Sequence, residues 1–215
     1  SGGSVATRWA QLIAWAGSIV AHRAELVVLA QAMVQTACPA TAVGYLARHD
    51  IVATWLYAQI TDPSIRPEYK ADVIDLLPAV VVQGKQDQLQ VALNFLQEKY
   101  FPVDSSEWLP GSVERDTMVT LYQALLRLLV TSGSIVVLRT VTCAAADREH
   151  ACAASIDLAM AQFMKQHSQE RQEEALKEVY SRFAQESSEG EVRLRVVENF
   201  LIPMILKASY SVVVK

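Results

Sequence analysis

The stretch MVTLYQALLRLLV, residues 118–130, decides the fold class of this chain. Its apolar residues recur at spacings of three and four, which is the period of one face of an α-helix. They are Met118, Leu121, Leu125, Leu128 and Leu129. A glutamine and an arginine stand between them, as expected on the solvent side of an amphipathic helix. The stretch therefore predicts a helix with one buried face.

Two other stretches repeat this pattern. In QLQVALNFLQ, residues 88–97, the apolar face consists of Leu89, Leu93 and Leu96. In ALKEVYSRF, residues 175–183, the predicted face consists of Leu176, Val179, Tyr180 and Phe183. Runs of β-branched residues, such as SIVVLRTV at 134–141, are short and lie in helical surroundings. We therefore expect an all-α fold without a substantial sheet.

Proline, glycine and short polar clusters divide the chain at fairly regular intervals. These breaks fall at Pro39, DPSIRP (62–67), Gly84, residues 102–111, SGS (132–134), Asp147, Ser168 and SSEG (187–190). Helix pairs would then begin near residues 68, 114, 149 and 191, about 35 to 46 residues apart, close to the period of HEAT and armadillo repeats. The sequence thus predicts an α-solenoid segment of degenerate HEAT/armadillo-like repeats.

The stretch PVDSSEWLPGS, residues 102–112, interrupts the helical pattern with two prolines. A stack of helical hairpins tolerates such a connection between pairs, and loops this long are seldom featureless. We expect Trp108 and Leu109 to fold back over an apolar edge. Ser112 or Asp116 could cap the next helix, just as Pro67 suits the first turn of an earlier one.

Composition limits the classes of function. The chain has 215 residues, 52% of them apolar, so it can bury a sizeable core. Its net charge of −4 gives no support to a dedicated nucleic-acid-binding domain, because affinity for phosphate rests on lysine and arginine. Its three cysteines, Cys38, Cys143 and Cys152, indicate reduced thiols in an intracellular protein rather than a disulfide scaffold.

Two N-terminal features concern processing and membranes. Residues 1–4, SGGS, are interpreted as an appended or disordered segment rather than a signal peptide. Residues 26–47 carry no charge and are long enough to span a bilayer. Polar residues and the central Pro39 favour a helix–turn–helix outside the membrane instead, because lipid penalises unsatisfied polar groups. We expect helical hairpins in residues 5–66 and no membrane partner.

No constellation of residues predicts catalysis. The sequence lacks a glycine-rich phosphate loop, a kinase catalytic loop and a nucleophile elbow. Cys143, His150 and Cys152 could suggest a metal site, but their spacing does not give paired ligands on one helix face. The histidines His22, His49 and His167 are expected to be caps or surface residues. We expect no catalytic, cofactor-binding or metal-binding residue in this chain.

Two weaker signals concern charge and modification. A basic strip could be formed by Arg182, Arg193, Arg195 and Lys207, with Arg127 and Arg139 as extensions. Scattered solubility charges are the favoured alternative. Ser168, followed by Gln169, is interpreted first as the N-cap of the next helix.

From Lys70 onward, the order of segments resembles the central helical region of the DNA-dependent protein kinase catalytic subunits, within the phosphatidylinositol-3-kinase-related kinases. Its more distinctive parts are the step from Asp72 to Leu-Leu-Pro and the Phe-Pro and Pro-Gly loop. The stretches that carry it are KADVIDLLPAVV (70–81), YFPVDSSEWLPGS (100–112), LYQALLRLL (121–129), REHACAASIDLAMAQF (148–163), ALKEVYSRF (175–183) and VVENFLIPMI (196–205). Residues 67–215 are therefore assigned to a helical-repeat region.

The resemblance implies a role and partners that the residues alone do not give. This family of nuclear serine/threonine protein kinases acts in DNA double-strand break repair by non-homologous end joining. The Ku heterodimer recruits it to DNA ends, and its helical repeats form a ring-like cradle. Its kinase domain lies far toward the C-terminus, so no catalytic residue is carried over. Because the family phosphorylates serine or threonine before glutamine, Ser168 is a candidate phosphosite.

The sequence hypothesis is a non-catalytic scaffold segment that contacts other parts of a parent kinase and, through the whole assembly, Ku and DNA ends. The alternative is a free-standing helical-repeat adaptor that binds a protein partner. A third possibility is direct DNA binding by the strip at Arg193 and Arg195.

Overall fold

A computed structural model of the protein describes residues 50–81, 86–101, 110–144, 152–185, 194 and 196–208. Every regular element in these ranges is helical, and no described residue lies in a strand. The predicted all-α class is confirmed. No helix in the described ranges combines the length and apolar character needed to cross a bilayer.

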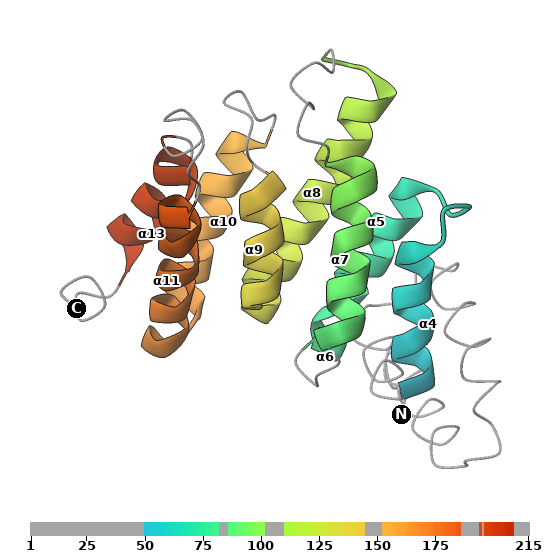
Figure 1. The fold of residues 1–215 in the computed structure, drawn as a ribbon, viewed down its shortest axis with the longest axis horizontal. Coiled ribbons are helices and arrows are strands. Elements are labelled where there is room, and N and C mark those ends of the chain that lie inside the picture. Colours follow the sequence, from blue (N-terminus) through green and yellow to red (C-terminus); the bar gives the residue numbers. More distant parts are fainter. Residues whose placement is uncertain are drawn as a thin grey trace, which may run out of the picture. The chain divides into compact units, whose positions relative to one another are not determined.

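The chain divides into two compact units, Ser1–Ala92 and Leu93–Lys215, which are described separately. The boundary predicted at residues 66 and 67 marks where the family resemblance begins, and it stays a prediction. The first unit contains α4 (Asp50–Thr61), α5 (Pro67–Leu76), α6 (Pro78–Val81) and the start of α7 (Gln86–Tyr100). The second contains the end of α7, α8 (Val113–Ser132), α9 (Ile135–Ala144), α10 (Ala153–Gln166), α11 (Gln169–Gln185), the π-helical turn η3 (Val197–Leu201) and α13 (Ile202–Lys207) (Figure 1).

In the first unit, a tight polar turn separates α4 from α5. The Asp62 carboxylate accepts hydrogen bonds from the backbone N–H of Ser64 at 2.9 Å and from its hydroxyl at 2.7 Å. These bonds lower the pKa of Asp62. Pro67 then occupies the first turn of α5, where its missing N–H has no intrahelical acceptor to lose. The predicted break and the predicted role of Pro67 are both confirmed.

The buried side chain of Lys70 caps the C-terminus of α4 in the first unit. Its side chain is fully buried, and its ammonium donates to the carbonyls of Gln59 at 3.1 Å, Ile60 at 2.6 Å and Asp62 at 2.5 Å. The last carbonyls of a helix have no intrahelical donors, and a cation there is favoured by the helix dipole. Lys70 therefore fixes α5 against the end of α4.

In the second unit, α8 has a defined cap at each end. The hydroxyl of Ser112 accepts from the N–H of Arg115 at 3.2 Å, so Ser112 rather than Asp116 is the N-cap. Gly133 has φ +65°, and its N–H donates to the carbonyl of Leu129 at 2.9 Å. This left-handed conformation suits glycine, and it ends α8 within the predicted SGS break.

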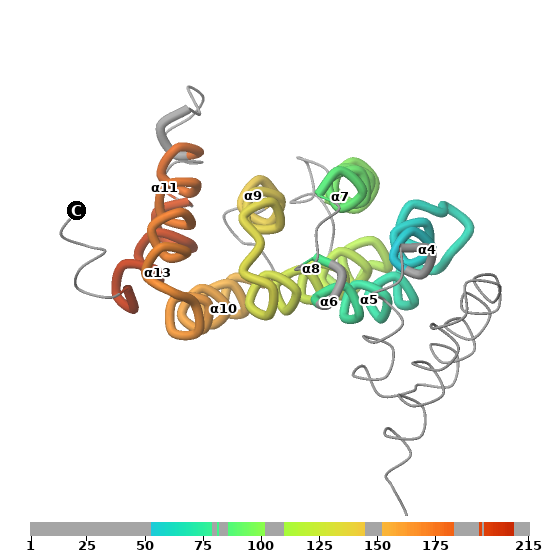
Figure 2. The backbone as a smooth tube through the Cα atoms, turned by 90° about the horizontal axis from the view of Figure 1, so that it is seen from below, coloured from blue at the N-terminus to red at the C-terminus, as the bar shows by residue number. Residues whose placement is uncertain are grey.

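The helices of the second unit form two rows. α8 packs against both α9 and α10, and α9 packs against α11. In Figure 2, α8 and α10 lie along one side of this unit while α9 and α11 lie along the other. η3 and α13 pack against α10, and η3 also contacts α11. Helices that are next-but-one in sequence are therefore neighbours within a row.

The core between the rows follows the predicted apolar face of α8. All five predicted residues of residues 118–130 are buried, as are Leu93 and Leu96 in the part of α7 that belongs to this unit. The predicted Leu89, in the part of α7 that belongs to the first unit, is buried there as well. Fully burying a leucine side chain contributes about 2 kcal/mol. Tyr122 is fully buried, and its ring packs edge-on against that of Phe101 with the ring centroids 5.8 Å apart. Its hydroxyl donates a hydrogen bond to the carbonyl of Val141 at 2.8 Å.

A π-helical turn precedes α13 for a reason that is visible in the sequence. Pro203 has no N–H, so the regular i to i−4 ladder cannot continue through it. Just before it, the N–H of Ile202 donates five residues back, to the carbonyl of Val197. Such a widened turn is typical of an insertion into a helical ladder.

One predicted core residue is wrong. Tyr180 of α11 is 62% exposed, whereas Ala175 and Val179 are fully buried and Gln172 is almost so. The buried stripe of α11 thus runs one position earlier than the sequence pattern indicated. Several predictions lie outside the described residues, namely those on residues 1–49, Gly84, Trp108, Leu109, Asp147 and residues 187–190. Phe183 lies within α11, but the burial of its side chain is not described.

Candidate functional site

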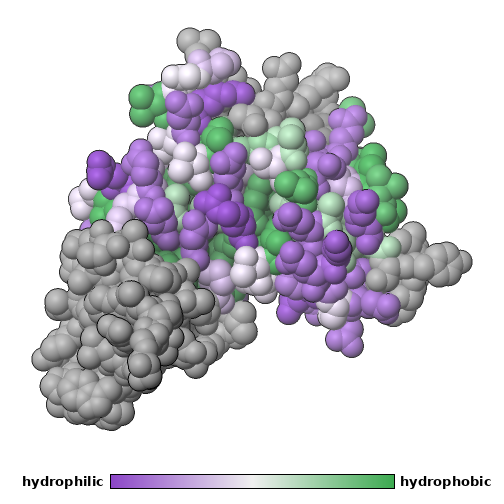
Figure 3. All heavy atoms as spheres, turned by 180° about the vertical axis from the view of Figure 1, so that it is seen from behind, coloured by the Kyte–Doolittle hydropathy of each residue, from purple (hydrophilic) through white to green (hydrophobic). Residues whose placement is uncertain are grey.

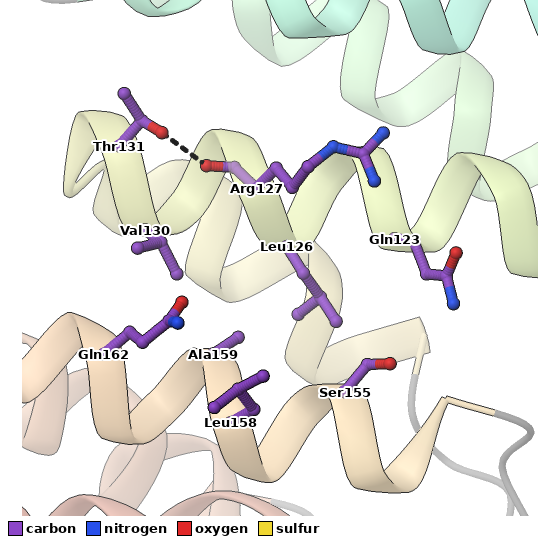
Figure 4. A pocket seen from close by; sticks show the side chains of 9 residues that line it. All are labelled: Gln123, Leu126, Arg127, Val130, Thr131, Ser155, Leu158, Ala159 and Gln162. Carbon is purple, nitrogen blue, oxygen red and sulfur yellow. Dashed lines mark hydrogen bonds between the residues drawn. The ribbon is translucent and has the colours of Figure 1, made fainter.

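A groove between α8 and α10 is a candidate site in the described part of the second unit. It has a volume of about 360 Å³. Its lining comes from one face of each helix: Gln123, Leu126, Arg127, Val130 and Thr131 of α8, and Ser155, Leu158, Ala159 and Gln162 of α10. The spacings of three, four and seven residues put each set on one face of its helix. In Figure 4, Leu126 and Val130 point toward α10 and Ala159 and Gln162 point toward α8, whereas Thr131 points away from α10.

The groove has an apolar floor and a polar rim. Leu126, Val130 and Ala159 are buried, while Leu158 remains 59% exposed. The rim is formed by the amides, hydroxyls and guanidinium of Gln123, Arg127, Thr131, Ser155 and Gln162. The hydroxyl of Thr131 donates to the carbonyl of Arg127 at 2.9 Å, so it is held against its own helix (Figure 4). An apolar floor with a few polar groups around it is typical of pockets that bind ligands.

The two helices are joined at one end of this groove. The Nε2 of His167, at the C-cap of α10, lies 2.7 Å from the carbonyl of Val130. Because a carbonyl only accepts, Nε2 carries the proton in this contact. The ring also packs on Phe163, with centroids 4.6 Å apart. His167 was expected to be a cap or surface residue; its ring additionally ties α10 to the last turn of α8.

A second hollow of about 240 Å³ adjoins the groove. Ala161, Gln162, Lys165 and Lys207 line it, so Gln162 belongs to both hollows. Leu158, Gln162 and Lys165 follow one another at spacings of four and three along α10, and Lys207 comes from the end of α13. The two hollows therefore meet at Gln162, and the second, the charged corner, carries two lysines.

The electrostatic character of this surface is positive. Three cations, Arg127, Lys165 and Lys207, line the two hollows, and none of the described lining residues is an aspartate or glutamate. Such a one-sign lining raises the local concentration of oppositely charged groups. Lys207 was predicted to belong to a basic strip with Arg182; the structure places it beside Lys165.

Arg182 has a different environment. Its Nε lies 3.8 Å from Glu178 Oε1, and the same carboxylate accepts from Arg139 Nε at 2.7 Å and from Arg139 Nη2 at 3.3 Å. The hydrogen bond from Arg139 lowers the pKa of Glu178 and raises that of Arg139. Arg182, a member of the predicted basic strip, and Arg139, one of its predicted extensions, thus share the carboxylate of Glu178. This carboxylate lies between α9 and α11. Arg193 and Arg195 lie outside the described residues.

Ser168 is the N-cap of α11, as the first interpretation had it. Its hydroxyl accepts from the N–H of Arg171 at 3.3 Å, and the residue is exposed. Behind it, the buried amide of Gln172 donates to the carbonyls of Met164 at 2.8 Å and His167 at 3.0 Å. The candidate phosphosite at Ser168 stays a prediction.

The thiols do not form a reactive site in the described part of the chain. Cys152 is buried, and burial raises its pKa to about 11, which disfavours the nucleophilic thiolate. Cys143 is half-buried. Within the described ranges, no group of three or more histidine, cysteine or acidic side chains could hold a metal ion. His150 and Cys38 lie outside those ranges.

The first unit has a smaller hollow of about 280 Å³ between α4 and α7. Thr54, Tyr57, Ala58, Thr61, Asp87, Gln88 and Val91 line it. The hydroxyl of Tyr57 and the Oε1 of Gln88 are both inaccessible and have no hydrogen-bond partner among the residues that the structure describes. Burial raises the pKa of Tyr57 to about 12. Because these two atoms cannot be reached from the hollow, we treat them as a packing defect rather than a ligand site.

Sequence reasoning missed the contribution of α10 to the groove. Leu158, Gln162 and Lys165 lie on one face of α10, and only the first of them is apolar. Because leucine is usually buried, Leu158 would normally be assigned to the core. A helical projection that places Ile156, Met160 and Phe163 on the buried face leaves Leu158 on another face. That signal was present in the sequence.

Comparison with known proteins adds no relative to this description. No protein-family model matches the chain, and no match was found among curated proteins.

Proposed function

We propose that the chain is a non-catalytic helical scaffold segment of a large protein kinase similar to the DNA-dependent protein kinase. In this proposal the helices form degenerate HEAT- or armadillo-like repeats. The parent protein would be a nuclear serine/threonine kinase that acts in double-strand break repair by non-homologous end joining. The segment itself would carry no catalytic residue.

One observation supports the repeat architecture most directly. α8 packs against α9, and the next-but-one pairs α8–α10 and α9–α11 are also in contact. Stacked helical hairpins have this order of contacts, since each repeat touches only adjacent repeats. The two rows in Figure 2 agree with such a stack. In a solenoid, small rotations between repeats add up to curvature, which suits a scaffold.

The kinase assignment rests on the sequence resemblance in residues 70–205. In this proposal, the principal partners are other segments of the parent kinase. Ku and DNA ends would be contacted through the whole assembly. The segment would transmit geometry between the DNA-end assembly and a distant kinase domain.

The mass of the native polypeptide tests this proposal. An antibody raised against the 215-residue chain would be used to isolate the endogenous protein for denaturing electrophoresis and peptide sequencing. We expect a chain of several thousand residues with a lipid-kinase-like catalytic domain downstream. It should also be retained with Ku on linear DNA but not on closed circular DNA. A native chain of about the present length would exclude the scaffold proposal.

A free-standing adaptor is the second candidate. The groove between α8 and α10, with Leu158 exposed over an apolar floor, favours it. Such grooves in helical proteins take amphipathic peptide segments. A short native chain in the mass experiment would leave this candidate in place.

A further inference from the structure

The α8–α10 groove offers an apolar anchor point that its own unit does not use. Leu158 is 59% exposed in a hollow whose other apolar members, Leu126, Val130 and Ala159, are buried. Hydrophobic and hydrophilic residues are interspersed over the face seen in Figure 3. A volume of about 360 Å³ accommodates one or two large apolar side chains from a partner.

The lysines near this groove lie toward the C-terminal end of α10. From Leu158, two further turns along α10 lead through Gln162 to Lys165, a rise of about 10 Å. Lys165 shares the adjoining hollow with Lys207, and neither lysine forms an ion pair with any residue that the structure describes. The carboxylates nearest in sequence, Glu170 on α11, Asp157 on α10 and Glu198 on η3, are not among the lining residues.

This combination selects among the possible classes of partner. A nucleic acid would need a row of cations along its phosphates, and an apolar floor with an exposed leucine would contribute little to it. A second apolar helix face would leave two lysines desolvated without partners. A peptide with apolar side chains followed by carboxylates satisfies both parts of the surface.

We propose that the α8–α10 groove is a docking site for an acidic amphipathic peptide segment. Its apolar side chains enter between Leu126, Val130 and Leu158. Its aspartate or glutamate side chains, about two helical turns further on, contact Lys165 and Lys207. Arg127, on the rim of α8, provides a further contact for an acidic flank.

This inference names the occupant of the groove and depends on the second unit alone. It extends the adaptor candidate and is equally compatible with a scaffold, in which the acidic segment could belong to another protein of the assembly. The mass experiment decides the scaffold proposal, whereas peptide selection decides this one. The two proposals can therefore fail separately.

Peptide selection is the direct test. A displayed library of random peptides is selected on the folded 215-residue chain, and enriched sequences are synthesised with a fluorescent label for anisotropy titrations. We expect enriched peptides to combine leucine, isoleucine or phenylalanine with a run of acidic residues on one side. Replacing their acidic residues by lysine should weaken binding about tenfold or more, and added salt should weaken it as well.

Matched variants of the protein locate the binding. Leu158→Ser removes the anchor, and the pair Lys165→Glu with Lys207→Glu reverses the charged corner. Each should weaken binding about tenfold or more. Leu206→Ser changes an even more exposed leucine that does not line the groove, and Lys177→Glu reverses an exposed lysine on α11. Both controls should bind as the unchanged chain does.

Several results would overturn the proposal that the groove binds an acidic peptide. Failure to enrich any peptide, enrichment of basic or uncharged peptides, or unchanged affinity in Leu158→Ser would each overturn the proposal. Duplex DNA that competes for binding, with a loss on reversal of the lysines but not in Leu158→Ser, would assign the corner to nucleic acid instead. Circular dichroism of each variant confirms that its helices remain folded, which is expected because Leu158 and both lysines are exposed.

Discussion

In the first unit, the carbonyls at the C-terminus of α4 receive hydrogen bonds from the ammonium of Lys70. In the second unit, the carbonyls that end α10 receive them from the carboxamide of Gln172. Both side chains come from the helix that follows, both are buried, and neither helix end has a glycine cap. In each unit, a buried side chain therefore donates to the carbonyls that have no donor within their own helix. The capping group is charged in the first unit and neutral in the second.

The difference in charge has physical consequences. An ammonium gains from the negative end of the helix dipole and from charge-assisted hydrogen bonds, but its burial costs solvation. A carboxamide gains less from each hydrogen bond and loses less on burial. Lys70 contacts three carbonyls and Gln172 two. The first unit should thus depend more strongly on its single capping side chain than the second does.

Replacing Lys70 by methionine is expected to have the largest effect. Methionine keeps the length of the side chain but removes all three hydrogen bonds at the end of α4. Leaving buried carbonyls without donors costs about 1–3 kcal/mol each in the worst case, so we expect a loss of about 3 kcal/mol after relaxation. Urea unfolding followed by circular dichroism measures the change.

Lys177→Met is the matched control for this variant. Lys177 is an exposed lysine on α11, so the same substitution removes a charge without a buried contact. Its effect should lie within about 0.5 kcal/mol of zero. If Lys70→Met were no more destabilising than this control, the ammonium would not stabilise the end of α4.

Gln172→Met makes the corresponding change in the second unit. The substitution preserves the volume and removes the bonds to Met164 and His167. We expect a loss of about 2 kcal/mol, less than for Lys70→Met, because two neutral hydrogen bonds are lost rather than three charged ones. Gln169→Met, at an exposed position one turn earlier, is the control. Equal losses in the two capping variants would contradict the comparison.

Both capping residues were in principle readable from the sequence. Lys70 precedes the buried Val73 and Ile74 by three and four residues, and Gln172 precedes Ala175 by three and Val179 by seven. Each polar residue therefore continues the apolar stripe of its helix. Sequence reasoning assigned polar residues to the solvent face as a class, and so missed these two. A helical pattern gives the period of the stripe but not which polar member is buried.

Other parts of the fold could be predicted because they depend on local chemistry. Ser112 as N-cap, Pro67 in a first turn and the end of α8 at residues 132–134 follow from backbone groups within a few residues. The groove between α8 and α10 could not be predicted, since it depends on which faces of two separated helices meet. Tyr180 shows the same limit, because a shift of one position moves a side chain by about 100° around a helix.

Gly133→Ala tests how the second unit ends α8. Gly133 has φ +65°, and an added Cβ would lie 2.7 Å from Cε1 and 2.9 Å from Nδ1 of His167. We expect a loss of about 1–2 kcal/mol from the left-handed backbone alone, with a further loss from the clash. In a His167→Ala background the clash disappears, so the same substitution should be less costly. Thermal or urea unfolding of the unchanged chain, the two single variants and the double variant measures the interaction energy between the two substitutions. If the losses in free energy of unfolding simply add, the ring of His167 moves aside without cost.

The smallest expected effects come from two buried tyrosines, one in each unit. The hydroxyl of Tyr122 donates to the carbonyl of Val141 in the last turn of α9, whereas that of Tyr57 has no partner in the described part of the chain. Tyr122→Phe should therefore cost about 1 kcal/mol, while Tyr57→Phe should be neutral or slightly stabilising because it removes an unsatisfied buried group. Urea unfolding at neutral pH compares them. Equal losses would contradict the assignment of the unpaired hydroxyl.

The same pair gives a pH test with a defined sign. Burial raises the pKa of Tyr57 from its usual 10.0 to about 12, and it raises that of Tyr122 as well. The stabilisation from each protonated phenol is complete below about pH 10 and is lost as the pH rises toward the folded value, since the unfolded chain releases its proton first. Tyr57→Phe should reduce the loss of stability between about pH 10 and pH 12. The thiol of Cys152, whose pKa is raised to about 11, contributes equally in both proteins, so it cancels from the difference. An unchanged pH dependence in Tyr57→Phe would show that this phenol is already solvated in the folded chain.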